Sequence, residues 1–331
     1  MKQLAFLPVG LFGAAMGLSG LCIAWRLAHA LFGAPAWIGE GIGALAVLAF
    51  LAIASAYLGK LARFPSRVAA EWNHPVIGPL FSTVFISLLL LPVVIAPYAP
   101  GLARALWALG AVSMACFTTL MVHRWLTRRP ELDHAAPSWF VPVIGALNIP
   151  AAGMFGGNQA VHEFYLLCVA VGLFFAIVLF TLVFARLVFR APLPAAMRPT
   201  LMILIAPFGV GFIGYTQTVG GVDLLASLLF YCGVFLLIVL APVLVREAGK
   251  PPFRLAWWAI SFPLAALAVA GLRYANAVGG SFTFWLGVAI LAAATAAIAW
   301  VSLRTLYHLL RGDLLAPEIA AAKADTDKRR A

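Results

Sequence analysis

Residues 164–185 read FYLLCVAVGLFFAIVLFTLVFA and contain no Asp, Glu, Lys or Arg. A helix rises about 1.5 Å per residue, so about 20 such residues cross the ~30 Å hydrocarbon core of a bilayer. This stretch alone therefore predicts a transmembrane helix. Nine further uncharged stretches predict nine more crossings, and they lie at 3–25, 41–59, 72–103, 105–123, 134–162, 199–222, 224–245, 255–272 and 274–303.

The composition agrees with an all-α integral membrane protein of ten transmembrane helices. The 331-residue chain is 64% hydrophobic and only 10% charged, whereas soluble domains are about a quarter charged. The net charge of +11 might suggest a nucleic-acid partner, but the basic residues gather in loops between the uncharged stretches. We therefore expect the lipid bilayer, and no nucleic acid, as the partner of the surface.

The basic residues also predict the orientation. All but Arg26, Arg104 and Arg273 of the 22 Lys and Arg residues fall in the terminal segments or in alternate loops. Positive loops stay on the cytoplasmic side, so both termini are expected in the cytoplasm and the chain in the plasma (inner) membrane. Residues 1–311 form the predicted membrane domain, and 312–331 form a polar cytoplasmic tail that we expect to be disordered or a frayed helix.

Prolines divide the ten stretches into two classes. They lie in the odd-numbered stretches, as Pro8, Pro92, Pro150, Pro207 and Pro263, while the interiors of the even-numbered ones lack them. Proline removes a backbone hydrogen bond, and in a membrane the freed carbonyl must be satisfied by protein or by water. The pattern predicts five helical hairpins, with an inner ring of odd helices around a central pore. Gly13 and Gly17 form a G-x-x-x-G pair, which is typical of close helix packing.

No enzymatic or metal-binding motif is found in the sequence. It lacks H-E-x-x-H, G-x-S-x-G, a phosphate loop and metal-ligand spacing, so we predict no enzyme, no cofactor and no metal. The uncharged stretches also lack the carboxylate, Lys or His that coupled carriers place at mid-membrane. What remains is a weakly polar conduit whose hydroxyl and helix N-terminal donors favour anions, although Ser and Thr commonly bond their own helix. The polar residues concerned are Ser82, Thr83, Ser87, Asn148, Thr200, Tyr215, Thr216 and Ser261.

The segment Trp257–Pro263, WWAISFP, places an aromatic ring beside a predicted helix break. Phe262 has no donor or acceptor, so in a conduit it would block ions sterically and by excluding water. The alternative is that Phe262 packs between helices, as most Phe side chains do.

Several motifs, in order along the chain, resemble the tellurite-resistance/dicarboxylate transporter family, which includes the plant slow anion channels and the bacterial tellurite-resistance membrane protein. The resemblance covers nearly all of 1–311. Its motifs are PVGLFGAAMGL at 8–18, EWNHPV at 71–76, PSWFVP at 137–142, RPT at 198–200, AP at 206–207, GVD at 221–223 and WWAISFP at 257–263. Ala15 departs from it, since some members have proline there.

The resemblance implies five hairpins around an anion pore, a homotrimer with one pore per subunit, and Phe262 as the pore gate. We therefore predict an anion channel for small monovalent anions. Proline kinks and lining are expected at Pro8, Gly13, Gly17, Pro92, Pro150, Pro207, Ser261 and Pro263. The alternative is a proton-coupled or facilitated exporter or importer of C4-dicarboxylate, sulfite or tellurite-type oxyanions, because the family includes such members. A structural scaffold is the more distant possibility.

Overall fold

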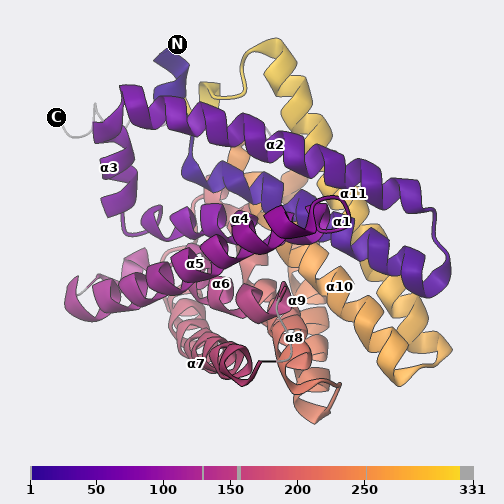
Figure 1. Ribbon diagram of the computed structural model, residues 1–331. Coiled ribbons are helices and arrows are strands. Elements are labelled where there is room, and N and C mark those ends of the chain that lie inside the picture. The colour runs from indigo at the N-terminus through magenta and orange to yellow at the C-terminus, as the bar shows by residue number, and fades with distance from the viewer. Residues whose placement is uncertain (1, 129, 155–157, 251, 321–331) are drawn as a thin grey trace.

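The computed structural model describes residues 2–128, 130–154, 158–250 and 252–320 (Figure 1). Within these residues the chain is helical and has no strand. Nine of the described helical segments are long and apolar enough to cross a membrane. The prediction of an all-α membrane protein is thereby confirmed at the level of helix content.

Long exposed helices alternate along the chain with shorter buried ones, and each buried helix packs on the exposed one that follows it. The exposed helices are as apolar as the buried ones, because a surface that faces lipid needs no charge. Among the 18 residues that make each segment apolar enough to cross a membrane, 89% are buried in Leu255–Val278 and 22% are buried in Leu224–Ala248. The buried-then-exposed pairs are α1 (Gly13–Phe32) with α2 (Ala36–Arg63), α4 (Ser82–Ile95) with α5 (Pro100–Arg128), α6 (Phe140–Ala151) with α7 (Gln159–Phe189), α8 (Ala206–Val219) with α9 (Leu224–Ala248), and α10 (Ser261–Val278) with α11 (Ser281–Arg311).

Each buried helix is preceded directly by a 3₁₀ segment. These segments are η2 (Val9–Phe12), η3 (Gly78–Phe81), η5 (Pro137–Trp139), η6 (Ala195–Ile205) and η7 (Leu255–Ile260). Proline suits such a start, because its fixed φ matches a first helical turn and the amide it lacks has no partner there anyway. Three further elements lie outside this pattern: η1 (Lys2–Phe6), α3 (Pro65–Asn73) and η4 (Leu132–His134).

The prolines predicted as kinks lie near the ends of the buried helices. Pro8 precedes η2, Pro207 lies in the first turn of α8, and Pro263 is the third residue of α10. Pro92 and Pro150 do lie inside helices, but close to the ends of α4 and α6. The predicted absence of proline from even-numbered spans is also wrong for Pro242, which lies inside α9 because that helix continues to Ala248.

The fifth predicted span, 134–162, is the one that is not a long helix. It forms η5 and the 12-residue α6, and α7 begins at Gln159; residues 155–157 lie outside the described part of the chain. For the tail the expectation was disorder or a frayed helix. Residues 316–320 are helical, and 321–331 lie outside the described residues.

Several helices extend past the uncharged stretches that predicted them, so charged side chains fall inside helices. Arg26 lies in α1, Arg104 in α5 and Arg273 in α10, not in the loops where we expected them. A helix can continue into the interfacial region, where the polar headgroups tolerate charge, so the last charge-free residue need not end it.

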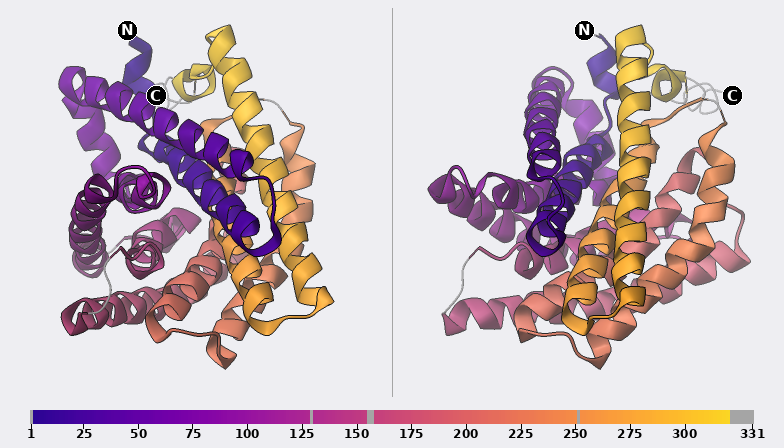
Figure 2. Two further views of the ribbon diagram at one scale, coloured as in Figure 1. Left: turned by 45° about the vertical axis from the view of Figure 1, so that its right-hand side comes forward. Right: turned by 90° about the vertical axis from the view of Figure 1, so that its right-hand side faces the viewer.

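The two described ends of the chain lie on the same side of the molecule. Element η1 and the helix at 316–320 both lie at the top in the two views of Figure 2. We name this the terminal side and the opposite side, where α10 joins α11, the distal side. Each of the five exposed helices has a basic residue in its last turn, where the negative end of the helix dipole favours a cation.

Candidate functional site

Two cavities lie among the buried helices, and Phe262 lines both. The larger has a volume of about 220 Å³ and is lined from α1, α4, α6, α8, α10 and the 3₁₀ segments that precede buried helices. The smaller has a volume of about 70 Å³ and is lined by α1, α4, α6, α8 and α10. We name them the terminal cavity and the distal cavity. A single aromatic side chain thus belongs to the walls of two spaces in the core of the molecule.

The walls of the two cavities repeat one spacing on five helical segments. On each segment, residues at i, i+3, i+7 and i+10 line a cavity; the first two positions line the terminal cavity and the last two line the distal cavity. This spacing places four side chains on one face of a helix. The five sets are Gly13, Met16, Gly20 and Ile23; Thr83, Ile86, Leu90 and Val93; Val141, Ile144, Asn148 and Ala151; Ile203, Ala206, Val210 and Ile213; and Ala259, Phe262, Ala266 and Val269.

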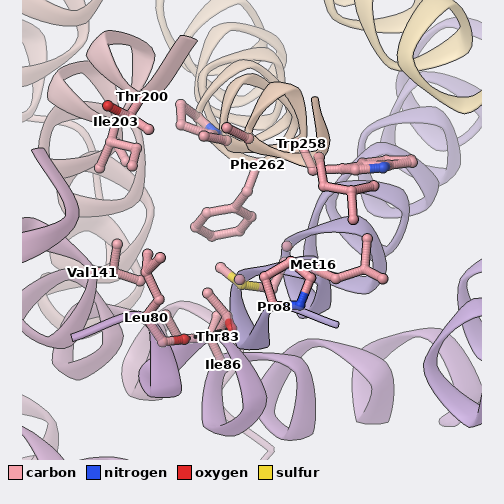
Figure 3. Close-up of a pocket in the computed structure, with 18 of the residues that line it drawn as sticks. Pro8, Met16, Leu80, Thr83, Ile86, Val141, Thr200, Ile203, Trp258 and Phe262 are labelled. Atoms are coloured by element: carbon pink, nitrogen blue, oxygen red, sulfur yellow. Dashed lines mark hydrogen bonds between the residues drawn. The ribbon is translucent and has the colours of Figure 1, made fainter. Parts of the chain in front are cut away.

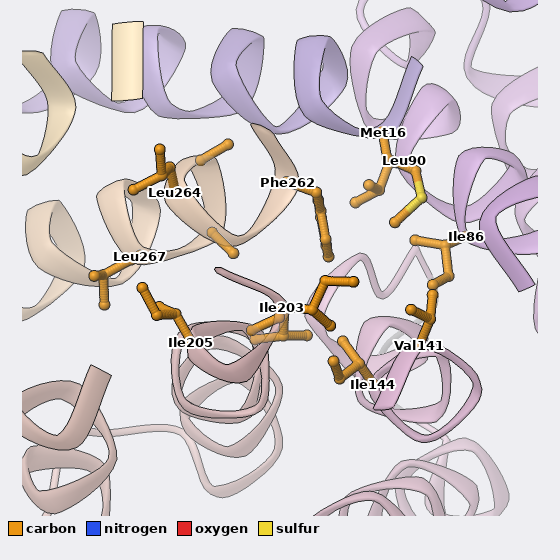
Figure 4. Packing of buried hydrophobic residues seen from close by; sticks show 14 of the residues in the cluster. Met16, Ile86, Leu90, Val141, Ile144, Ile203, Ile205, Phe262, Leu264 and Leu267 are labelled. Carbon is orange, nitrogen blue, oxygen red and sulfur yellow. The ribbon is translucent and has the colours of Figure 1, made fainter. Parts of the chain in front are cut away.

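The Phe262 ring extends from α10 into the space between the other lining helices (Figure 3). Its side chain is 7% exposed and belongs to the buried apolar cluster, where Met16 and Ile203 lie near it (Figure 4). The two interpretations of this residue are therefore both met in part, because it packs among apolar side chains and also lines two cavities. A Cβ added to Gly20 would lie 2.9 Å from Ala265 Cβ, so glycine at this position allows α1 to approach α10 closely beside Phe262.

Close contact between α1 and α10 positions Phe262. A Cβ added to Gly17 would lie 2.1 Å from Ser261 Oγ, so only glycine permits this approach of the two helices. The Ser261 hydroxyl donates to Trp258 O at 2.7 Å and to Gly13 O at 3.2 Å. Gly17 and Ser261 therefore join the helix that carries Phe262 to its neighbour.

Most of the hydroxyl groups that were expected to donate hydrogen bonds to anions already donate hydrogen bonds within the protein. Thr83, Ser87 and Thr200 donate to backbone carbonyls three or four residues earlier, at 2.6–2.7 Å. Ser82 and Thr216 do the same, and Tyr215 donates to Asp223. The prediction of hydroxyl donors along the conduit is wrong for these groups, because each proton already has an acceptor.

The predicted site residues are not all in the cavity walls. Pro8, Gly13, Pro263 and Phe262 line the terminal cavity. The other five, Gly17, Pro92, Pro150, Pro207 and Ser261, belong to neither cavity wall. Within the described residues no group of three or more His, Cys, Asp or Glu side chains could hold a metal ion.

Two charged residues line the cavities and were not predicted from the sequence. Glu318 lines the terminal cavity, and its Oε1 accepts from Leu255 N at 3.4 Å. Its Oε2 is buried and has no hydrogen-bond partner among the described residues. Burial raises the pKa of this carboxyl, while backbone hydrogen bonds and the positive charge of Arg254 lower the pKa by smaller amounts. It was overlooked because it lies in the segment expected to be a disordered tail.

Arg273 lines the distal cavity. The sequence did contain a signal for it, because Phe262, Ala266, Val269 and Arg273 follow the helical spacing i, i+4, i+7 and i+11. We had treated the residue as part of a loop, so its place on the face of Phe262 was missed.

Comparison with known proteins identifies the family. A family model described as voltage-dependent anion channel matches residues 7–306. The S-type anion channel SLAH3 of Arabidopsis thaliana is 29% identical over 325 residues, which cover 95% of this chain and 50% of SLAH3. The tellurite resistance protein TehA homolog of Haemophilus influenzae is 26% identical over 311 residues and is covered to 92%, as is this chain. The chain spans about half the length of SLAH3 and 57% of the guard cell S-type anion channel SLAC1 of Arabidopsis thaliana, to which it is 25% identical.

The resemblance predicted from the sequence motifs is confirmed by these matches. The family match extends over nearly all of the membrane-spanning part of the chain, from just before η2 into α11. The relatives are membrane transport proteins and not enzymes. The chain belongs to the voltage-dependent anion channel family, as a multi-pass membrane protein.

Proposed function

We propose that the chain is an anion channel whose pathway runs through the terminal and distal cavities and is closed by Phe262. The carrying observation is that five buried helical segments present side chains at one repeated spacing to both cavities, and among the described residues only Phe262 belongs to both of their walls. In this proposal the ten crossings are five hairpins, with α1, α4, α6, α8 and α10 as an inner ring.

The chemistry of the walls favours small monovalent anions. Most lining side chains are apolar, so an ion in the pathway must give up part of its hydration shell, which is less costly for an ion of single charge than for one of double charge, and the narrow space admits only a small ion. The Phe262 ring offers no hydrogen bond and narrows the space between the cavities. It would therefore act by steric block and by excluding water.

The basic last turns of the exposed helices support a cytoplasmic terminal side, in the plasma (inner) membrane. The family resemblance further leads us to propose a homotrimer with one pathway per subunit. Native mass spectrometry of the purified protein would test this, with a trimer of the 35.2 kDa chain as the expected species.

Truncation of the ring tests the gate. We expect Phe262→Ala to raise anion current in planar bilayers by about tenfold or more, which corresponds to lowering the barrier by ~1.4 kcal/mol. Phe212→Ala is the matched control, because Phe212 is a buried Phe of α8 that lines neither cavity.

Equal currents from folded Phe262→Ala, Phe212→Ala and unaltered protein would exclude Phe262 as the gate. Size-exclusion profiles and thermal unfolding of the three proteins in detergent establish that each is folded. Phe262→Leu, which shortens the side chain without emptying the space, should give an intermediate current.

A coupled carrier for dicarboxylates or oxyanions is the second candidate. The observation in its favour is Glu318, a half-buried carboxylate in the wall of the terminal cavity that would be able to exchange a proton. A carrier predicts saturable, proton-gradient-dependent uptake of succinate or sulfite into liposomes. Anion flux that is independent of the proton gradient would support the channel instead.

A further inference from the structure

We propose that the distal cavity is a binding site for one small inorganic anion, with the Arg273 guanidinium and the Asn148 amide as its ligands. This inference rests on the anion pathway proposed above and adds to it a charged site beyond the gate. Among the residues that the structure describes, no other side chain in the wall of this cavity carries a charge or an amide.

The position of Arg273 is set by the helix that carries the gate. Eleven residues separate it from Phe262, which is about three turns, or about 16 Å along α10. Ala266 and Val269 lie between them on the same helical face, and all four residues line the distal cavity. The cation therefore lies along the same wall as the Phe262 ring, toward the distal side.

The charge of Arg273 is not neutralised by the protein. Within the described part of the chain no carboxylate lies within 4.0 Å of its guanidinium, and its hydrogen bond to Gln217 Oε1 is long, at 3.4 Å. A guanidinium has five N–H donors, so most remain for a ligand.

Arg26, in the corresponding part of α1, shows the contrast. It pairs with Glu40 at 2.7 Å and donates to the carbonyls of Val93 and Val94 at 3.2 and 2.8 Å. It thus serves helix packing and does not line either cavity. Of these two arginines near the distal side, Arg273 is the one whose donors can serve an anion.

Asn148 supplies the second ligand from α6. Its side chain is 1% exposed and lines the distal cavity. Nδ2 donates one hydrogen to Ile144 O at 3.0 Å, and an amide nitrogen carries two. The second N–H is therefore free for a ligand in the cavity.

The remaining wall is apolar, which strengthens the attraction between a cation and an anion by keeping water away. The cavity volume of about 70 Å³ exceeds the ~10–15 Å³ that one water molecule requires. A small anion therefore fits this space. The site would concentrate anions next to the gate and repel cations.

The first test measures conduction with the gate removed. In the Phe262→Ala background, we expect Arg273→Gln to lower single-channel conductance at low salt by about tenfold, the lower end of electrostatic focusing, and to reduce the chloride-over-potassium permeability ratio. Arg273→Lys should retain part of both. The difference should shrink at 1 M salt, where charges are screened beyond ~3 Å.

Arg104→Gln is the matched control, because Arg104 is an exposed arginine of α5 that lines neither cavity. We expect it to leave conductance and selectivity unchanged. If Arg273→Gln and Arg104→Gln behave alike in the open background, the distal anion site is excluded, although the proposed channel stands.

The second test does not depend on conduction. Crystals of the unaltered protein grown in bromide should show anomalous scattering in the distal cavity between Arg273 and Asn148, and crystals of Arg273→Gln should not. Bromide in the cavity without anion current from Phe262→Ala would support the site and exclude the channel. An empty cavity at molar bromide would overturn the site, whatever the currents.

Discussion

Gly17 illustrates at the scale of one residue why α1 and α10 can meet. The two helices approach so closely that a methyl group would overlap Ser261. We expect Gly17→Ala to destabilise the protein by about 1–3 kcal/mol, the usual cost of overpacking. The measurement is thermal unfolding in detergent. Gly41→Ala, at a glycine of α2 with open space around it, should be neutral or slightly stabilising because alanine favours a helix.

Ser261→Gly should restore part of the stability lost in Gly17→Ala, because both the Oγ and the Cβ of Ser261 lie within 2.3 Å of the added methyl position. If Gly17→Ala is as stable as Gly41→Ala, the close approach of the two helices is wrong. The same experiment bears on the position of Phe262, because Phe262 directly follows Ser261 at the start of α10.

At the scale of elements, α3 is joined to α2 by a buried ion pair. Lys60 is fully buried, contacts Glu71 Oε1 at 2.6 Å and donates to Leu7 O at 2.7 Å. Tyr57 donates to the other oxygen of Glu71 at 2.7 Å. One lysine thus links α2, α3 and the segment that leads into η2.

We expect Lys60→Met to cost about 3–5 kcal/mol, because it leaves a mostly buried carboxylate without its partner. Lys250→Met, at an exposed lysine that pairs with Glu247, should cost at most ~1 kcal/mol. Unfolding in detergent measures both. Limited proteolysis should in addition find faster cleavage around α3 in Lys60→Met only, and equal cleavage in the two variants would contradict this role of the pair.

At the scale of the whole molecule, the described end of the chain returns to the entrance of the proposed pathway. The helix at 316–320 brings Glu318 into the wall of the terminal cavity. Burial raises the pKa of its carboxyl, so the group releases its proton at a higher pH than an ordinary glutamate. Above that pKa a negative charge faces the route of an anion.

We expect the current of Phe262→Ala to rise as the pH falls through the raised pKa, because protonation removes this charge. Glu318→Gln in the same background should conduct at the higher level at every pH, and Glu131→Gln, at an exposed carboxylate outside the cavity wall, should keep the pH dependence. Bilayer recordings across a pH series measure all three. A Glu318→Gln current that still varies with pH would contradict this role.

The same raised pKa has a consequence for stability. The folded state holds the proton to a higher pH than the unfolded state, so stability falls as the pH rises from the ordinary glutamate range through the raised pKa. Glu318→Gln should therefore be more stable than the unaltered protein at neutral pH.

The uncharged stretches and the proline pattern determined the helical membrane class and which helices would be buried, because a bilayer excludes charge and an interrupted helix needs protein around it. The segment WWAISFP likewise drew attention to Phe262, which lines both cavities, while the role of gate came from the family resemblance. These inferences depend on local composition and on one helix at a time, so no tertiary contact was needed.

Tertiary structure alone decided the rest. The 3₁₀ starts, the short α6, the hydrogen bonds of the hydroxyls and the close contact of Gly17 with Ser261 depend on which backbones meet. Arg273 was read as a loop residue and Glu318 as part of a disordered tail, because charge marks the edge of an apolar stretch but not the end of a helix. Only the packing of five helices brings these two charges to the walls of cavities on either side of one aromatic ring.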